Sequence, residues 1–192
     1  MFSVQLLSTI QMHRVEVRLK SHLTDARGQG LVKDIHDLGI TTVAGARVAD
    51  IYWLDASLSP EDLDLVCRHA LTDPITEEFS TVSHEKPAQA AGARTHTVEV
   101  AYRPGVTDPV EASVLKAISD LSVPGVKQVK TSKLYIIEGK LSKKQLDTIS
   151  LRLLVNPIIQ HVVKGEHIVF PENPQYEFRL EVIDIFSGNK AE

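Results

Sequence analysis

The chain has 192 residues, 43% of them hydrophobic, and a formal net charge of −4 at pH 7. This composition is ordinary for a globular protein of one or two domains, and the negative charge gives no general attraction to nucleic acid or to an anionic membrane. The single cysteine excludes a disulfide framework within the chain and fits a reducing compartment. We therefore expect a cytoplasmic protein whose partner is another protein or a small molecule.

The first residues, MFSVQLLSTIQ, are apolar but lack the basic start and the cleavage site of a signal peptide. The run is also too short to cross a bilayer. Residues 1–12 are therefore expected to form an N-terminal extension without a targeting role.

The chain contains two predicted repeats, residues 13–80 and 96–168, and a shift of 83 positions aligns residues 13–80 with residues 96–163 without a gap. The identical positions include Val15/Val98, Asp25/Asp108, Tyr52/Tyr135, Ser59/Ser142 and Pro74/Pro157. A gapless match that includes turn and capping residues indicates an internal duplication.

Each repeat begins with a strand and a helix. The segments VEVRL and VEVAY alternate apolar and polar residues, as a strand with one buried face does. Asp25 and Asp108 stand where the following helix needs an N-cap. In the second repeat, Pro109 at the first helical position and Glu111 as a reciprocal capping residue complete the pattern.

A long strand follows, over residues 43–56 in the first repeat and 126–138 in the second. Both strands contain four consecutive apolar residues, IYWL and LYII, and neither has a central turn signal. A strand that is apolar on both faces needs cover on both faces. The helices of one repeat can cover only one face, so we expect the other face to meet the second repeat or a partner.

The second helix of each repeat is predicted to begin at the N-caps Ser59 and Ser142 and to end before Pro74 and Pro157, after which the chain re-enters a strand. Each repeat thus reads β-α-β-α-β. A unit of about 65 residues has a marginal core by itself. The predicted fold is therefore α+β, with two repeats packed as a pseudo-dimer, mainly antiparallel sheets and helices outside.

Residues 81–95 are polar and alanine-rich, with neither amphipathic period, and are expected to form an exposed linker. Residues 169–192 are expected to form a C-terminal extension with one strand, since Tyr176, Phe178, Leu180 and Val182 alternate with polar residues.

The sequence identifies no catalytic, cofactor-binding or metal-binding residue in this chain. Cys67 lies on the predicted buried face of a helix, the eight histidines lack the spacing of a ligand set, and Gly28-Gln29-Gly30 lacks the third glycine of a dinucleotide loop. The two repeats do differ in charge, which could orient a docking partner. The charged residues concerned are Lys127, Lys130, Lys133, Lys140, Lys143 and Lys144 in the second repeat and Glu61, Asp62 and Asp64 in the first.

The second repeat resembles a known family. Its segments VEVAYRPGVTDPVEASVLKAISDL and KLYIIEGKLSKKQLDTISLRLLVNPIIQ are similar to the small PurS subunit of phosphoribosylformylglycinamidine synthase, and to the related N-terminal region of large forms of that enzyme. The resemblance covers residues 98–163 well and residues 13–80 more weakly. Its motifs are structural and not catalytic.

The resemblance implies a non-catalytic subunit that dimerises through its sheets and bridges the synthetase (PurL-like) and glutaminase (PurQ-like) components. The complete enzyme converts formylglycinamide ribonucleotide to its amidine in purine biosynthesis, with ATP and with ammonia from glutamine. The resemblance therefore places ATP and magnesium in the partner synthetase and no cofactor in this chain. Small members of the family carry a single copy, whereas two copies make this chain a covalent pseudo-dimer.

Five residues are candidates for contact with a partner: Tyr52, Trp53 and Tyr135 on the long strands, and Asp73 and Asn156 at the exits of the second helices. Each also has an ordinary structural role, in the core for the aromatic residues and in a turn for the other two.

Two questions of function stay open at this point. The chain could be an independent double subunit or the head of a longer synthetase, and it could self-associate. The alternative function belongs to a different class: the chain would be a tandem ferredoxin-like regulatory protein that binds a small metabolite between its repeats. That arrangement has a two-stranded hairpin between its helices, which the single long strand argues against.

Overall fold

The computed structural model describes residues 12–81 and 94–163. The first repeat contains β1 (Met12–Leu19), α1 (Ala26–Asp37), β2 (Val43–Ala56), α2 (Pro60–Val66), its π-helical continuation η1 (Cys67–Leu71), and β3 (Glu77–Thr81). The second contains β4 (Thr95–Tyr102), α3 (Glu111–Asp120), β5 (Val126–Gly139), α4 (Lys143–Ile149), η2 (Ser150–Leu154) and β6 (Gln160–Val162). The predicted β-α-β-α-β order and the single long strand are confirmed in both repeats.

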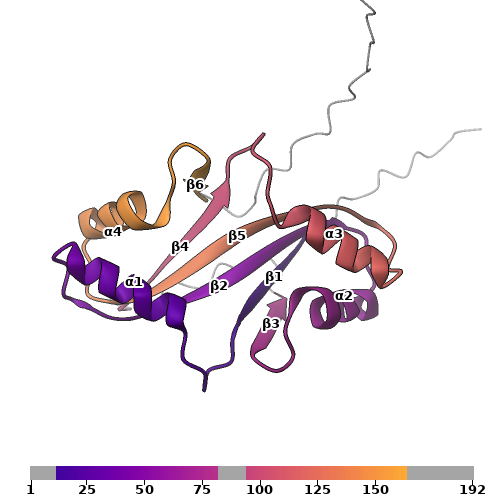
Figure 1. Ribbon diagram of the computed structural model, residues 1–192, viewed down its shortest axis with the longest axis horizontal. Helices are drawn as coiled ribbons and strands as arrows, with labels where there is room; N and C mark the ends of the chain where they lie inside the picture. Colours follow the sequence, from indigo (N-terminus) through magenta and orange to yellow (C-terminus); the bar gives the residue numbers. More distant parts are fainter. Residues whose placement is uncertain (1–11, 82–93, 164–192) are drawn as a thin grey trace, which may run out of the picture.

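All six described strands form one sheet, in the order β3-β1-β2-β5-β4-β6 (Figure 1). The repeats join edge to edge, because β2 pairs with β5 in antiparallel register from Val43 opposite Gly139 to Ala56 opposite Val126. Asp50 lies opposite Lys133, and these two positions are equivalent in the repeats. The pseudo-twofold axis of the duplication therefore passes between them.

Of the two expectations for the remaining face of each repeat's sheet, cover by the second repeat is wrong, and cover by a partner stays a prediction. Each long strand has 14 residues and uses only one of its edges within its own repeat. In an isolated repeat the other edge would carry unpaired N–H and C=O groups. Pairing β2 with β5 forms hydrogen bonds to these groups on both strands. The repeats therefore lie side by side and not face to face.

All four helices cover one face of this sheet, with α1 and α4 at one end and α2 and α3 at the other (Figure 1). Each end has a core built from both repeats. At one end α3 contributes Val114 and Ile118 to a cluster around Val15, Val17 and residues of α2 and η1. At the other end, helices α1 and α4 share a cluster with β4 and β5. The two halves are therefore interlocked.

Three of the four predicted N-caps are confirmed. The side chain of Asp25 accepts hydrogen bonds from the backbone N–H groups of Arg27 and Gly28, and Ser59 accepts one from Asp62. Ser142 and Gln145 cap each other reciprocally at the start of α4. These caps fix where three of the helices begin.

The fourth predicted cap, with Asp108 and a reciprocal Glu111, is wrong. Helix α3 begins only at Glu111, and Val110 occupies its N-cap position without a side-chain cap. The carboxylate of Asp108 instead accepts from the backbone N–H groups of Val110 and Thr131. Glu111 forms an ion pair with Lys130. Asp108 therefore holds the turn before α3 against β5, and Glu111 pairs with β5, so the two residues do not form a reciprocal cap.

None of the described helices has the length and the apolar character needed to cross a membrane. The expected N-terminal extension up to residue 11, most of the expected linker and the expected strand around residues 176–182 lie outside the described residues.

Candidate partner interface

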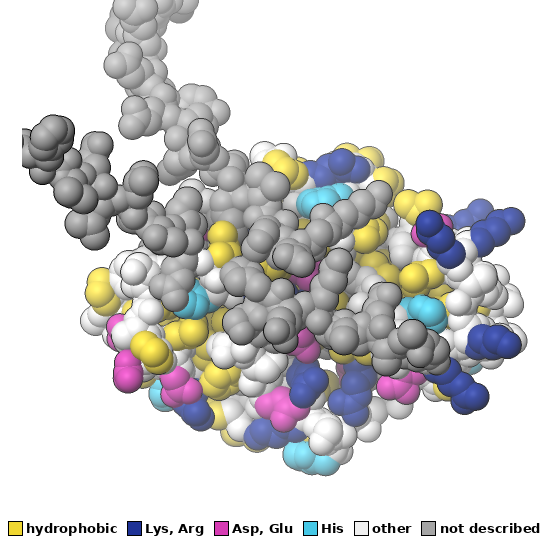
Figure 2. Space-filling view, turned by 180° about the vertical axis from the view of Figure 1, so that it is seen from behind, with side chains coloured by type: hydrophobic (Ala, Val, Ile, Leu, Met, Phe, Trp, Pro, Cys, Tyr) yellow, Lys and Arg dark blue, Asp and Glu magenta, His cyan; other side chains and the backbone are white. Residues whose placement is uncertain are grey.

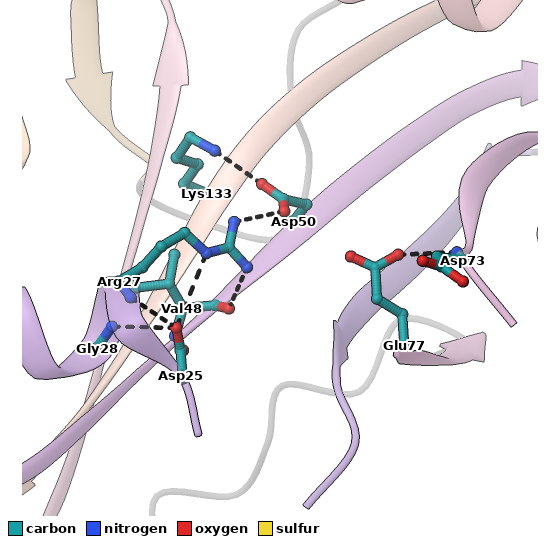
Figure 3. A network of polar contacts seen from close by, with 8 residues as sticks. All are labelled: Asp25, Arg27, Gly28, Val48, Asp50, Asp73, Glu77 and Lys133. Atoms are coloured by element: carbon teal, nitrogen blue, oxygen red, sulfur yellow. Dashed lines mark hydrogen bonds and ion pairs between the residues drawn. The ribbon is translucent and has the colours of Figure 1, made fainter. Parts of the chain in front are cut away.

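The centre of the helix-bearing face carries a charged cluster on the pseudo-twofold axis (Figure 3). Lys133 Nζ lies 2.8 Å from Asp50 Oδ1, and Arg27 of α1 approaches the other oxygen of Asp50 to 2.7 Å. Arg27 also donates to the carbonyl oxygen of Val48 at 2.9 Å. Burial alone would raise the pKa of Asp50, but hydrogen bonds from Lys133 and Arg27 outweigh it and hold the pKa below its usual value.

Tyr52 and Tyr135, two of the predicted contact residues, flank this cluster. They occupy equivalent positions, and both line a cleft of about 90 Å³ together with Asp50 and Lys133. Burial, with the nearby charges of Asp50 and Glu77, raises the pKa of Tyr52 to about 12. Burial likewise raises the pKa of Tyr135. Both rings are therefore neutral phenols at physiological pH.

The size of this cleft bears on the alternative of metabolite binding. Pockets for small-molecule ligands usually have volumes of about 300–1,000 Å³. A cleft of about 90 Å³ holds a few water molecules and not a nucleotide. The axis cleft therefore gives no support to a metabolite site between the repeats.

Trp53 points to the opposite face of the sheet, away from the two tyrosines. Its side chain is buried, and its indole Nε1 donates to Glu99 Oε1 at 3.1 Å and to Ser132 Oγ at 3.3 Å. Arg14 pairs with Glu99 at 3.1 Å and stacks over the indole ring, with its guanidinium 5.6 Å from the ring centroid. This network connects strands of both repeats. Trp53 therefore stabilises the junction between the repeats from the face opposite the helices.

Asp73 and Asn156 form matching turns at the exits of η1 and η2. Asp73 Oδ1 accepts from the N–H group of Ile75 at 2.8 Å, and Asn156 Oδ1 accepts from that of Ile158 at 3.1 Å. The backbone N–H of Asp73 donates to Glu77 Oε2 at 2.9 Å, as Figure 3 shows. These bonds fix each turn in one conformation.

The turns hold apolar residues out into solvent. Ile75 is 79% exposed and Ile158 is 81% exposed, at equivalent positions. The sequence analysis did not identify these two isoleucines as surface residues. Both follow a turn proline, and this repeated pattern could have indicated an exposed apolar residue in each repeat.

The structure explains the residues that the sequence analysis considered for catalysis, metal binding and phosphate binding. Cys67 is fully buried, and burial raises the pKa of its thiol to about 12, so it carries no reactive thiolate at physiological pH. No group of three or more potential metal-binding side chains lies together in the part of the chain that the structure describes. Gly28 lies against the backbone of β2, where a Cβ atom would come within 2.0 Å of the carbonyl oxygen of Ala46. Close helix packing, and not phosphate binding, explains this glycine.

Comparison with known families decides the relationship. The model of the PurS family, described as phosphoribosylformylglycinamidine (FGAM) synthase, matches residues 12–85 and again residues 95–164. The chain belongs to the PurS family. A search of curated proteins gave no match.

The two matches follow the structural duplication. Each PurS match covers one set of β-α-β-α-β elements, so the chain is a tandem pair of PurS-like repeats, as its sequence predicts. Asp50 and Lys133 lie on the pseudo-twofold axis between the two PurS-like repeats. In a symmetric dimer of identical chains, both axis positions would carry the same residue, so an opposite-charge pair can form only because the two repeats have diverged.

Proposed function

We propose that this chain is a non-catalytic assembly unit of FGAM synthase that bridges the synthetase and glutaminase components. The observation that carries the proposal is the double PurS match, on two repeats that interlock into one sheet. The exposed Ile158 and the charged axis cluster support it, because rigid apolar and charged surface features suit protein contacts.

In this proposal the chemistry belongs to the partners. The synthetase (PurL-like) component would bind ATP and magnesium and convert formylglycinamide ribonucleotide to its amidine, and the glutaminase (PurQ-like) component would supply ammonia. The chain would contribute binding surface and relative position. A cytoplasmic location fits the buried, unpaired thiol of Cys67.

Reconstitution tests the proposal. The purified chain is mixed with the synthetase and glutaminase proteins of its source, with and without glutamine and ADP, and analysed by size-exclusion chromatography with light scattering. We expect a complex that contains all three proteins, and glutamine-dependent amidine formation that is at least tenfold faster with the chain than without it. Failure to co-elute under any of these conditions would contradict the proposal.

The same samples test the alternative of a metabolite-binding regulator. A thermal-shift panel of amino acids and nucleotides is expected to change the melting temperature of the isolated chain by less than about 1 °C, because the axis cleft is too small for them. Stabilisation by several degrees with one metabolite would favour the regulatory function instead.

A further inference from the structure

Two equivalent parts of the surface have opposite charge. We call residues 57–76 the first arm and residues 140–159 the second arm; each contains the second helix of its repeat and the turn that follows. The first arm has four negative residues and one positive residue, a net charge of −3, and the second has four positive residues and one negative residue, a net charge of +3. The residues are Glu61, Asp62, Asp64, Arg68 and Asp73 in the first arm, and Lys140, Lys143, Lys144, Asp147 and Arg152 in the second.

The second arm also exposes more apolar surface. Arg68 of the first arm lies 2.7 Å from Asp64 in an ion pair one helical turn away, but its equivalent in the second arm is Leu151, which is 66% exposed. Ile159, in turn, replaces Thr76 of the first arm. Together with Ile158, the second arm therefore presents three exposed apolar side chains in its last nine residues.

The basic residues of the second arm are not explained by the stability of α4. Negative side chains near the start of a helix interact favourably with its dipole, as Glu61 and Asp62 do in α2. Helix α4 begins instead with Lys143 and Lys144, which the dipole disfavours. Within the described residues, none of the ion pairs includes these lysines, Lys140 or Arg152.

The arms lie far apart on the molecule. Helix α4 is at one end of the sheet and α2 is at the other (Figure 1). Lys and Arg side chains project from the end that carries α1 and α4, on the right in Figure 2. A single flat partner surface of ordinary size would therefore contact one arm and not both.

We propose that the second arm is a docking surface for an acidic protein surface with an apolar contact region, and that one copy of this partner binds per chain. Leu151 and Ile158 would supply the apolar contact, and Lys140, Lys143 and Lys144 would pair with acidic groups at its rim. The first arm has the opposite charge and repels such a partner. This inference rests on the proposed function, in which the partner is the synthetase or the glutaminase component.

The test exchanges residues between the arms. Leu151→Arg and Lys144→Glu install the residues of the first arm, and Leu151→Arg gives Asp147 an ion-pair partner at the spacing of Arg68 and Asp64. Binding to each purified component is measured by isothermal titration calorimetry at 50 and 300 mM salt. We expect either substitution to raise the Kd at least tenfold at 50 mM salt. We also expect wild-type binding to weaken with salt more steeply than binding of Lys144→Glu.

A matched pair provides the control. Ile158→Thr and Ile75→Thr alter equivalent exposed residues, so their effects on folding are expected to be equal and small, as checked by thermal unfolding. We expect Ile158→Thr to raise the Kd at least fivefold and Ile75→Thr to leave it within twofold. Equal effects of the two substitutions would overturn the inference, because the partner would then not distinguish the arms.

The remaining outcomes separate the inference from the proposed function. If the wild-type chain binds a component and the second-arm variants bind equally well, the inference fails and the proposed function stands. If the wild-type chain binds neither component, the proposed function fails and the inference fails with it. If light scattering shows that the second-arm substitutions abolish self-association of the chain, the occupant is a second copy, which also overturns the inference.

Discussion

Gly28 lies where the first turn of α1 crosses β2, and its equivalent in the second repeat is Glu111. Because glycine has no Cβ atom, α1 can begin at Ala26 in direct contact with the strand. Glu111 cannot pack in this way, and α3 begins later. The space beside Glu111 and Lys130 is a cavity of about 230 Å³, whereas the corresponding space beside Asp25 and Arg47 has a volume of only about 30 Å³.

Two glycines of α1 therefore respond differently to alanine. Gly28→Ala is expected to destabilise the protein by about 1–3 kcal/mol, because the new methyl group would meet the backbone of Ala46. Gly30→Ala, in the same helix with nothing within 4 Å of its Cβ position, is expected to stabilise it by about 0.5–1 kcal/mol. Urea unfolding of both variants checks the prediction. Destabilisation by both would show that α1 tolerates no added side chain.

Asp50 gives the axis cluster a pH dependence. Its pKa is below 3.8 in the folded protein, so its contribution to stability is fully present above that pH and is lost as the pH falls through the folded pKa. We expect Asp50→Asn to lower the free energy of unfolding by about 1 kcal/mol at pH 7, since both ion pairs are partly exposed. The difference from wild type should shrink as the pH is lowered below 3.8. Urea titrations at pH 7 and pH 3 measure it, and an unchanged difference at pH 3 would contradict the role of the charge.

At the scale of the elements, the second helices show how local sequence sets a boundary. Ser142 Oγ accepts from the backbone N–H of Gln145 at 3.3 Å, and Gln145 Oε1 accepts from the backbone N–H of Ser142 at 2.9 Å. Both partners lie within three residues, so the interaction does not depend on the rest of the fold. This is why the starts of α2 and α4 could be predicted from the sequence.

The cap at α4 predicts a specific mutational pattern. Ser142→Ala is expected to lower the free energy of unfolding by about 1 kcal/mol, because it removes the oxygen that accepts from Gln145. Ser142→Asp keeps an acceptor and places a negative charge beside Lys143 and Lys144, so it is expected to cost less than about 0.5 kcal/mol. Chemical unfolding distinguishes the two variants. Equal losses would mean that the hydroxyl group acts in some other way than as a cap.

Asp108 shows where element-level prediction fails. Its sequence context matches a helix start as well as Asp25 does, and yet its side chain bonds Thr131 of β5 through both the backbone N–H and the hydroxyl group. The equivalent oxygen of Asp25 accepts only from the backbone N–H of Val48, at 2.8 Å. Thr131 adds a hydroxyl donor that Val48 lacks, and a difference 23 residues away is invisible to local pattern reading.

The whole molecule is held together by contacts that cross between the repeats. The long strands pair over almost their full length, and each of the two cores on the helix-bearing face contains residues of both repeats. Either repeat alone would expose one edge of a 14-residue strand and half of each core. Two paired repeats are therefore a requirement of the fold, and the duplication supplies both of them in one chain.

Cutting the connection between the repeats tests this interlocking. A protease site introduced between residues 82 and 93 and then cleaved is expected to leave two fragments that co-elute in size-exclusion chromatography at neutral pH. The reason is the shared sheet and cores, which do not depend on the covalent link. The fragments should separate after urea is added. Separation without denaturant would show that the repeats are independent domains.

The sequence by itself determined the duplication, the order of elements, the long single strand and three helix starts, because these depend on periodicity and on partners a few residues apart. Strand alternation also places Asp50 and Tyr52 on one face and Trp53 on the other, but only the tertiary structure brought Tyr135 and Lys133 of the second long strand beside them. The tertiary structure likewise decided three other features: the edge-to-edge junction, the sharing of each core by helices of both repeats, and the different role of Asp108. Each depends on which strand edges and faces meet, and residues up to 98 positions apart form those contacts.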